Sequence, residues 1–389
     1  MQLNKNQQII AEKIKALKDA AGSHSPSIFT LIERIPELKI TIDACFLSNP
    51  YATDLFMRYL QQELCDTKKL RDVLEFYPSQ NSVIAEVLAN RLDLDKECIF
   101  VGNGAIEVIQ AVLHNFVERK IVVNIPTFSS YYEFSNTKTE VVLYQLAKEK
   151  DFALDTQAYI EFVKTQKPQS IVIINPNNPD GGYIPYEELR LIIASLPEVE
   201  NIIIDESFLH FAFEDDTYSF LSYSALFKEF PNVILIKSMS KDFGIAGIRA
   251  GYGIMAKDKV ARLLQNGYLW NSNGLSEYFF RLYVRNGFIS EYENVRKLYI
   301  QQTQEFFTHL SQIPKLKVYP SKANFAIIEI LNGETSTDFV MKMLIKHGIY
   351  VRTCSDKIGL NGEFIRLASR SKEENTKIIQ SLYDELRHS

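Results

Sequence analysis

The sequence predicts an α/β fold, with a large domain built on a mainly parallel sheet sandwiched by helices and a smaller α+β domain after it. Three observations support this prediction. Short, continuously apolar segments rich in Val and Ile alternate with stretches of helical spacing, which is typical of strands buried on both faces of a parallel sheet. The chain has 389 residues, and single cores stop growing near ~250–300 residues. The pattern changes after Gly274, which indicates a second domain.

The first expected element is an amphipathic helix over residues 5–20. Ile9, Ile14 and Leu17 recur at helical spacing among lysines, and Gly22 follows as a stop signal. Its apolar face could pack on its own domain, on a second subunit or on another partner. We favour packing on its own domain and expect a structural or dimer role.

Five apolar strands are expected next, each ending in a polar or turn-forming segment. They lie at residues 98–101, 121–125, 170–174, 201–205 and 232–236, and a helix containing Ile106 and Leu113 follows the first. Ligands of such sheets bind beyond the carboxyl ends of the strands. We therefore expect the polar and aromatic side chains near these ends to meet, namely Asn103, Phe128, Asn178, Asp205 and Lys241.

The last part of the chain is predicted to hold long helices and a short sheet. Residues 276–312 have helical patterns, strands are expected at 325–330, 349–352 and 364–369, and a final helix at 371–387. The expected domains are an N-terminal helix and arm over 1–48, a large domain over 49–274 and a small domain over 275–389.

Composition excludes several functional classes. The net charge of −5 lacks the basic surface of nucleic-acid binders. The start of the chain has no apolar signal region, and no stretch approaches the ~20 apolar residues of a membrane span. The four cysteines and six histidines are scattered, so we expect a reducing compartment, no disulfide framework and no metal site. A cytoplasmic protein without nucleic-acid or membrane partners is expected.

The segment SMSKDFGIAGIRAGYG, residues 238–253, places Lys241 between serines and a glycine-rich turn. A lysine that forms a Schiff base must lose its proton and reach an aldehyde. Ser238 and Arg249 are both able to donate to a phosphate. The glycines at 244, 247 and 251 are expected to let the backbone turn tightly and approach a ligand.

Other segments fit the same ligand, pyridoxal phosphate (PLP). Asp205 ends an apolar strand, and a buried carboxylate needs a partner such as a protonated pyridine nitrogen. Asn178 in NPNNPDG is able to bond a ring oxygen, and Phe128 to stack on the ring. GNGA, residues 102–105, opens a helix whose N–H groups favour phosphate.

Taken together, these motifs resemble fold-type-I PLP enzymes of the class I/II aminotransferases, over about residues 40–389. The branch they most resemble holds histidinol-phosphate aminotransferase and threonine-phosphate decarboxylase. The resemblance implies that Lys241 forms the Schiff base and shuttles protons, that Asp205 pairs with the pyridine nitrogen, and that Asn178 and Phe128 contact the ring. Phosphate binding would fall to Ser238, Arg249 and the N–H groups of Gly104, Ala105 and Ile106.

The resemblance also implies substrate and subunit contacts. Arg366 matches the arginine that binds the α-carboxylate, and Arg352 matches a residue near the distal group of the substrate. Asn49 matches a segment that closes over the substrate. Tyr77, in EFYPS, matches a tyrosine that reaches the phosphate of a neighbouring subunit, which implies a homodimer with shared active sites.

Two positions depart from the aminotransferase pattern. Phe208 stands where a tyrosine usually donates to the ring oxygen, and phenylalanine there looks more like the phosphothreonine decarboxylases. Ala105 and Ile106 stand where Ser and Asp are common, which leaves backbone N–H groups for the phosphate.

The expected activity is transfer of an amino group between a small amino acid, including one with a phosphate or other anionic group, and a 2-oxo acid. The alternative is an amino-acid-phosphate decarboxylase, because the same residues serve both outcomes and only the Cα bond aligned with the ring system differs. A third hypothesis, a non-catalytic regulator on this fold, is disfavoured because no basic helix-turn-helix stretch precedes residue 40.

Overall fold

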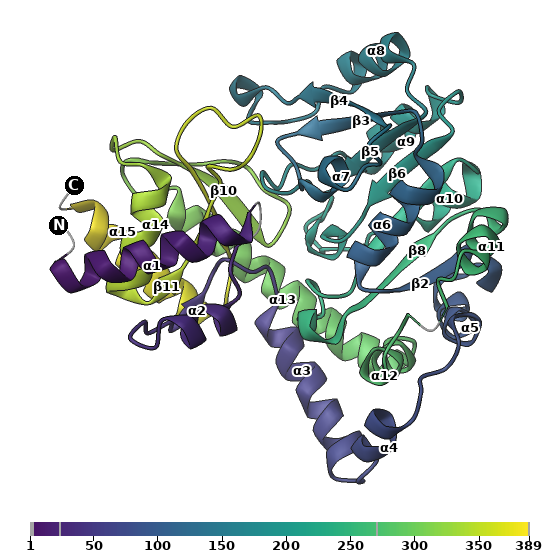
Figure 1. Ribbon diagram of the computed structural model, residues 1–389, viewed down its shortest axis with the longest axis horizontal. Coiled ribbons are helices and arrows are strands. Elements are labelled where there is room, and N and C mark those ends of the chain that lie inside the picture. The colour runs from purple at the N-terminus through teal and green to yellow at the C-terminus, as the bar shows by residue number, and fades with distance from the viewer. Residues whose placement is uncertain (1–3, 23–24, 270, 388–389) are drawn as a thin grey trace. The chain divides into compact units, whose positions relative to one another are not determined.

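The computed structural model describes residues 4–22, 25–269 and 271–387, and the chain divides into two compact units (Figure 1). The small unit comprises Met1–Leu47, Pro179–Gly181 and Ile300–Ser389, and the large unit comprises Ser48–Asn178 and Gly182–Tyr299. This division differs from the expected domains. The N-terminal segment belongs with the C-terminal one, and residues 275–299 belong to the large unit. Phe279 and Tyr292 explain the second difference, because both are buried in the core of the large unit.

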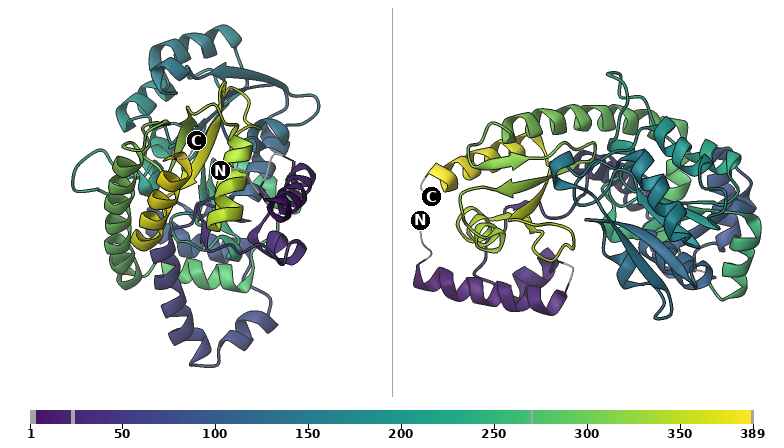
Figure 2. Two further views of the ribbon diagram at one scale, coloured as in Figure 1. Left: turned by 90° about the vertical axis from the view of Figure 1, so that its left-hand side faces the viewer. Right: turned by 90° about the horizontal axis from the view of Figure 1, so that it is seen from above.

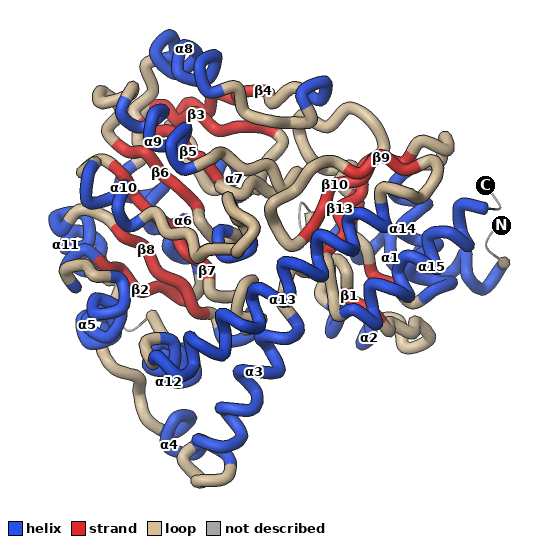
Figure 3. Tube along the Cα trace, turned by 180° about the vertical axis from the view of Figure 1, so that it is seen from behind, coloured by secondary structure: helices blue, strands red, loops and turns tan. Residues whose placement is uncertain are grey.

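The large unit contains a seven-stranded sheet of order β2-β8-β7-β6-β5-β3-β4 (Figure 3). All neighbours are parallel except β8, which runs antiparallel to both β2 and β7. The strands are β2 Ile99–Asn103, β3 Lys120–Ile125, β4 Glu140–Gln145, β5 Ser170–Ile174, β6 Asn201–Asp205, β7 Val233–Ser238 and β8 Ala250–Ile254. The five predicted strands are present.

Two strands of this sheet were not predicted. β4 is an edge strand with an exposed or partly exposed pattern, so it lacks the continuous apolar signal of the buried strands. β8 has the sequence AGYGI, and we interpreted its Gly251 as part of a turn. Its residues are all buried, and the glycines serve close packing against α6 and the turn before it.

Side chains of the central strands alternate between two helical layers. Ile202 and Ile204 pack in one core cluster and Ile203 in the other. The first layer holds α3 Pro50–Leu60, α5 Asn81–Leu92, α8 Thr156–Gln166, α9 Tyr186–Ala194, α10 Ser224–Glu229 and α12 Gly274–Tyr283. The second layer holds α6 Ala105–Phe116, α7 Ser130–Glu133 and α11 Lys257–Gln265. The sheet is therefore sandwiched by helices, as predicted.

Strand direction determines which segments meet at the functional edge. The carboxyl ends of β3, β5, β6 and β7 share one edge because these strands are parallel. β8 is reversed, so its first residue, Ala250, lies opposite Asn103 at the end of β2. The segment that precedes β8 thus lies at the same edge as the turn after β2.

The small unit has an antiparallel sheet of order β12-β13-β10-β9 and a parallel pair β1-β11. The strands are β1 Ile42–Asp43, β9 Leu316–Val318, β10 Phe325–Ile330, β11 Ile349–Tyr350, β12 Arg352–Thr353 and β13 Phe364–Ala368. The single strand expected at 349–352 is divided, because Tyr350 pairs with β1 whereas Arg352 pairs with β13.

Four helices complete the small unit: α1 Lys5–Ala21, α2 Ile28–Arg34, α14 Ser336–His347 and α15 Lys372–Arg387. The predicted N-terminal helix is present, and Gly22 ends it with a φ of 63°. α1 lies against α14 (Figure 2), so its apolar face packs within its own unit. The long helix α13, Asn286–Leu310, begins in the large unit and ends in the small one.

Within the described parts of the chain, no helix has the length and apolar character needed to cross a membrane. The same residues contain no group of three or more His, Cys, Asp or Glu side chains arranged to hold a metal ion.

Candidate active site

Asp205 is the last residue of β6 and only 4% exposed. Its two carboxylate oxygens accept hydrogen bonds from the hydroxyl of Tyr131, at 2.8 Å, and the backbone N–H of Ser207, at 2.9 Å. Burial raises the pKa of this carboxyl group, while the hydrogen bonds from Ser207 and Tyr131 oppose the rise. A protonated pyridine nitrogen would give this buried carboxylate a charged partner.

A cradle suited to a phosphate lies at the N-terminus of α6. Gly104 precedes the helix with a φ of 80°, and a Cβ atom there would lie 2.7 Å from Nη2 of Arg249. A Cβ atom on Gly251 would lie 2.5 Å from the backbone nitrogen of Ala105. The first N–H groups of a helix and a nearby guanidinium both favour an anion. The absence of side chains at Gly104 and Gly251 therefore lets the turn and the guanidinium come together.

Lys241 lies in the turn that follows β7, and two hydrogen bonds fix its backbone carbonyl. Its carbonyl accepts hydrogen bonds from the N–H of Asn49, at 2.9 Å, and of Gly244, at 3.3 Å. Gly244 has a φ of 65°, and a Cβ atom there would lie 2.3 Å from the carbonyl oxygen of Asn49. Ser238 ends β7, and its hydroxyl accepts from the N–H of Ser240 at 3.2 Å.

The prediction for the three glycines holds at only one position. Gly244 has the positive φ that a tight turn requires. Gly251 lies in a strand and serves close packing, and Gly247 has open space around its missing Cβ and no positive φ. The turn therefore depends on Gly244.

Asn178 and Phe128 follow neighbouring strands of the sheet, β5 and β3. Asn178 is 9% exposed, and its neighbour Asn177 donates to the carbonyl of Pro126 at 2.9 Å and accepts from Thr127 at 2.9 Å. These bonds join the two loops. Phe128 is partly buried against the core cluster of α6.

Of the remaining predicted residues, Asn49 also lies at this edge, where its N–H bonds the carbonyl of Lys241, whereas Tyr77, Arg352 and Arg366 take no part in these contacts. Tyr77 is 94% exposed, after the short helix α4 Leu70–Glu75. Asn49 is fully buried and caps α3, because its side-chain oxygen accepts from the N–H of Tyr51 and Ala52. Arg352 and Arg366 belong to the small unit, where they are register partners on β12 and β13. Large-unit contacts therefore gather Asp205, Lys241, Ser238, Arg249 and the Gly104 turn at one sheet edge.

Several buried polar residues were not predicted. Tyr131 is fully buried, and its hydroxyl donates to Asp205. Asp242, next to Lys241, lies 2.6 Å from Nζ of Lys237 and 2.7 Å from Nδ1 of His210. Burial alone would raise the pKa of Asp242, but the charge of Lys237 and the bonds from His210 lower it. The only feature of the sequence that pointed to this buried pair was a second lysine, four residues before Lys241.

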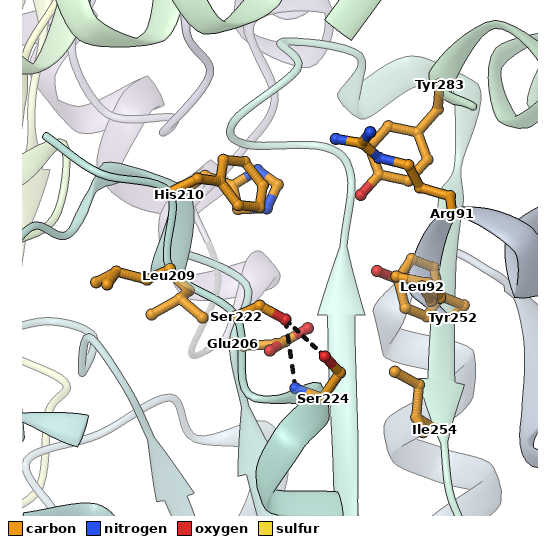
Figure 4. A pocket seen from close by; sticks show the side chains of 12 residues that line it. Arg91, Leu92, Glu206, Leu209, His210, Ser222, Ser224, Tyr252, Ile254 and Tyr283 are labelled. Atoms are coloured by element: carbon orange, nitrogen blue, oxygen red, sulfur yellow. Dashed lines mark hydrogen bonds between the residues drawn. The ribbon is translucent and has the colours of Figure 1, made fainter. Parts of the chain in front are cut away.

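A cavity of about 220 Å³ lies in the large unit (Figure 4). Lys237 contacts its wall, because its Nζ donates to the carbonyl of Glu206 at 3.2 Å. Glu206, His210 and Arg91 are among the side chains that line it. Oε2 of Glu206 is buried without a hydrogen-bond partner among the described residues, and burial raises the pKa of this carboxyl group to about 7. Ser222 and Ser224 bond each other at the wall of the cavity, 3.1 Å apart.

The residues at the sheet edge fit a phosphorylated pyridine. The buried carboxylate of Asp205 needs a cationic partner. The N-terminus of α6 and Arg249 form a cradle suited to an anion, and Lys241 lies in the turn that follows β7. The chain matches the family model "Aminotransferase class I and II" over residues 49–382. It belongs to this family of PLP-dependent enzymes, which confirms the resemblance, the α/β fold and the cofactor.

The more similar relatives are decarboxylases. The chain is 63% identical to the L-serine phosphate decarboxylase Cj1436c of Campylobacter jejuni, over 99% of this chain and 98% of the relative. It is 46% identical to the L-serine phosphate decarboxylase of Sulfurospirillum multivorans, over 96% of this chain and 95% of the relative. A solved structure of a decarboxylase from S. multivorans superimposes with a TM-score of 0.95 at 44% identity, covering 99% of this chain and 98% of the other.

These relatives overturn the expectation of an aminotransferase. The motifs around Lys241 and Asp205 serve both reactions, so they could not decide between them. The expected 2-oxo acid partner finds no support in these relatives. Phe208, which departs from the aminotransferase pattern and is 4% exposed, was the better indicator.

Proposed function

We propose that this chain is a PLP-dependent decarboxylase that converts L-serine phosphate into CO₂ and the corresponding phosphorylated amine. The observation that carries this proposal is the 63% identity to an L-serine phosphate decarboxylase over 99% of the chain. Phe208 supports it, because a phenyl ring cannot donate the hydrogen bond that a tyrosine gives at this position.

The residues have separate tasks in the proposed reaction. When bound, PLP supplies an electron sink for the electron pair left on Cα. The Asp205 carboxylate keeps the pyridine nitrogen protonated, and Asn178 and Phe128 hold the ring. The N–H groups of Ala105 and Ile106, with Ser238 and Arg249, would bind the phosphate of the cofactor. The N–H of Gly104, which was also expected to bind it, instead donates to the carbonyl of Gly102 at 2.8 Å.

Lys241 carries the cofactor and then acts on the substrate. As the bond between Cα and the carboxylate carbon breaks, CO₂ leaves without the electron pair. The ammonium group of Lys241 then delivers a proton to Cα, in the place that the carboxylate leaves. We assign Arg366 to the α-carboxylate and Arg352 to the phosphate of the substrate, because a dianionic tail and a carboxylate each suit a guanidinium.

We also propose a cytoplasmic homodimer with shared active sites. The 94% exposure of Tyr77 supports this arrangement, because an aromatic side chain so exposed is available to a second subunit. Asn49 is proposed to help close the site over the substrate. Its Nδ2 is buried without a hydrogen-bond partner among the described residues, and its N–H holds the carbonyl of Lys241.

The test is to supply the holoenzyme with L-serine phosphate and to measure CO₂, the phosphorylated amine and any 2-oxo acid. We expect CO₂ and the amine in equal amounts, and much slower turnover of L-serine, which lacks the phosphate. The variant Lys241→Ala should release no CO₂ and should lose the absorbance of the lysine-bound cofactor. A 2-oxo acid formed in place of CO₂, or no turnover of the phosphorylated substrate, would overturn the proposal.

A further inference from the structure

Positive charge is concentrated around the strand pair β12-β13 of the small unit. Arg352 and Arg366 lie directly opposite each other in this antiparallel pair, so their side chains project from the same face. Asp356, in the loop after β12, lies 2.7 Å from Nη2 of Arg352 and 3.7 Å from Nζ of Lys357. One carboxylate is therefore shared by an arginine and a lysine.

The N-terminal helix α1 adds a fourth cation. Lys18 lies four residues after the buried Ile14, so both residues are on the face of α1 that packs on the unit. Lys18 lines a small cavity with Ser25 and Thr353, and Oγ of Ser25 accepts from Nη1 of Arg352 at 3.1 Å. Burial and then the charge of Arg352 lower the pKa of Lys18.

Burial makes this gathering of like charges costly. Arg352 is 5% exposed, the side chain of Lys357 is 8% exposed, and burial lowers the pKa of Lys357 as well. The thiols of Cys45 and Cys354 lie near the arginines, but burial raises their pKa values, so they stay neutral at pH 7. Among the described residues that interact in this cluster, four cations thus lie with two carboxylates, those of Asp356 and of the exposed Asp19.

A surplus of buried cations is stabilised by an anion that carries more than one charge. A phosphate monoester has a charge of about −1.5 to −2 at pH 7 and three acceptor oxygens. A ligand with a single negative charge would leave half of the surplus in place. The cluster therefore favours a dianion over a monoanion.

We propose that Lys18 and Lys357, together with Arg352, form the subsite for the phosphate of the substrate, which makes α1 a specificity element. The identity of the substrate rests on the proposed function, whereas the presence of a dianion site does not. Arg366 is left to the α-carboxylate. The N-terminal helix then has a binding role in addition to its packing within the small unit.

The test measures binding of inorganic phosphate to the holoenzyme by calorimetry, and KM and kcat for L-serine phosphate. The variants Lys18→Met and Lys357→Met keep an apolar stem and remove the charge. Each should weaken phosphate binding and raise KM by about tenfold, the size of one charge-assisted hydrogen bond. kcat should change by less than about twofold, because binding and not chemistry is affected.

Matched variants separate charge from folding. Lys15→Met, on the exposed face of the same helix, should leave both quantities unchanged. Lys18→Arg and Lys357→Arg keep the charge and should retain most of the phosphate affinity. Equal loss in the Arg and Met variants, or phosphate binding by both Met variants at wild-type strength, would overturn the subsite.

The two proposals fail in different ways. If the holoenzyme binds phosphate and the Met variants lose it, but no CO₂ is released from L-serine phosphate, the proposed function fails and the dianion site stands. If CO₂ is released but wild-type holoenzyme binds no phosphate and the Met variants keep a normal KM, the subsite fails and the decarboxylase proposal stands.

Discussion

Asp205 shows how one buried side chain determines the chemistry of the site. Its oxygens accept from two neutral donors, Tyr131 and the N–H of Ser207. These bonds orient the carboxylate, and in the proposed function the cofactor pairs with its charge. We expect Asp205→Asn to retain PLP but to lower the rate of CO₂ release by about 100-fold or more, since the ring nitrogen loses its anionic partner.

The measurement for this variant is CO₂ release together with the cofactor absorbance. Tyr131→Phe is the control, because it removes one hydrogen bond and keeps the charge. It should cost about tenfold or less in rate. Comparable losses in the two variants would show that orientation, and not charge, is the contribution of Asp205.

The raised pKa of Glu206 leads us to expect that the free energy of unfolding depends on pH. Burial raises its pKa from the ordinary value of 4.5 to about 7 in the folded protein. Between these values the folded state holds a proton that the unfolded chain releases. Its stabilising contribution is therefore complete below about pH 4.5 and is lost as the pH rises through about 7.

Glu206→Gln should remove this dependence. We expect the variant to raise the free energy of unfolding at pH 8 by roughly 2 kcal/mol relative to the wild type, and by much less at pH 5. Urea unfolding of the holoenzyme at both pH values measures the difference. Glu149→Gln, at an exposed position, is the control. An equal effect of Glu206→Gln at both pH values would contradict the raised pKa.

At the scale of elements, the contact between β8 and α6 shapes the proposed phosphate cradle. We expect Gly251→Ala to weaken PLP binding by about tenfold or more, because its Cβ would lie 2.5 Å from the nitrogen of Ala105 and would displace the start of the helix. Gly247→Ala is the matched control, since nothing lies within 4 Å of its Cβ. Titration of each apoprotein with PLP measures the change.

Gly251→Ala and Gly247→Ala together distinguish two roles for the motif to which both glycines belong. A turn-forming role for the whole motif would make both substitutions harmful. The packing role assigned to Gly251 makes only one harmful, and equal effects would contradict it.

Strands were predicted correctly from the sequence where both of their faces are buried. The strands at β5, β6 and β7 carry unbroken runs of Ile and Val because helices cover both faces. β4 and β8 lacked this pattern, the first at an exposed edge and the second built with glycine. The strand expected at 349–352 was divided because its two halves pair with different partners.

At the scale of the whole molecule, Tyr77 provides a test of the proposed homodimer. If its side chain reaches the phosphate in a second subunit, Tyr77→Phe should weaken PLP binding by about three- to tenfold, since the phenolic hydroxyl is lost. The dimer should persist in sedimentation experiments. Phe29→Ala, at an aromatic position that is 86% exposed, is the control. A monomeric wild-type protein with full activity would contradict shared sites.

Which segments of the chain form each of the two units is also visible only at this scale. The motif NPNNPDG is divided between them, with Asn178 in the large unit and Pro179–Gly181 in the small one. Gly181 has a φ of 77°, and its carbonyl accepts from the N–H of Lys322 at 2.9 Å. A contact over such a separation in sequence leaves no periodic signal.

The sequence by itself determined the α/β class, the buried strands and the residue types suited to PLP, because periodicity and strand-end chemistry are local properties. The tertiary structure alone decided which residues share a site and which unit each segment joins. Tyr131 meets Asp205 across 74 residues, and His210 meets Asp242, the residue next to Lys241. Such contacts depend on strand order and close packing, which join segments whose local patterns are independent of each other.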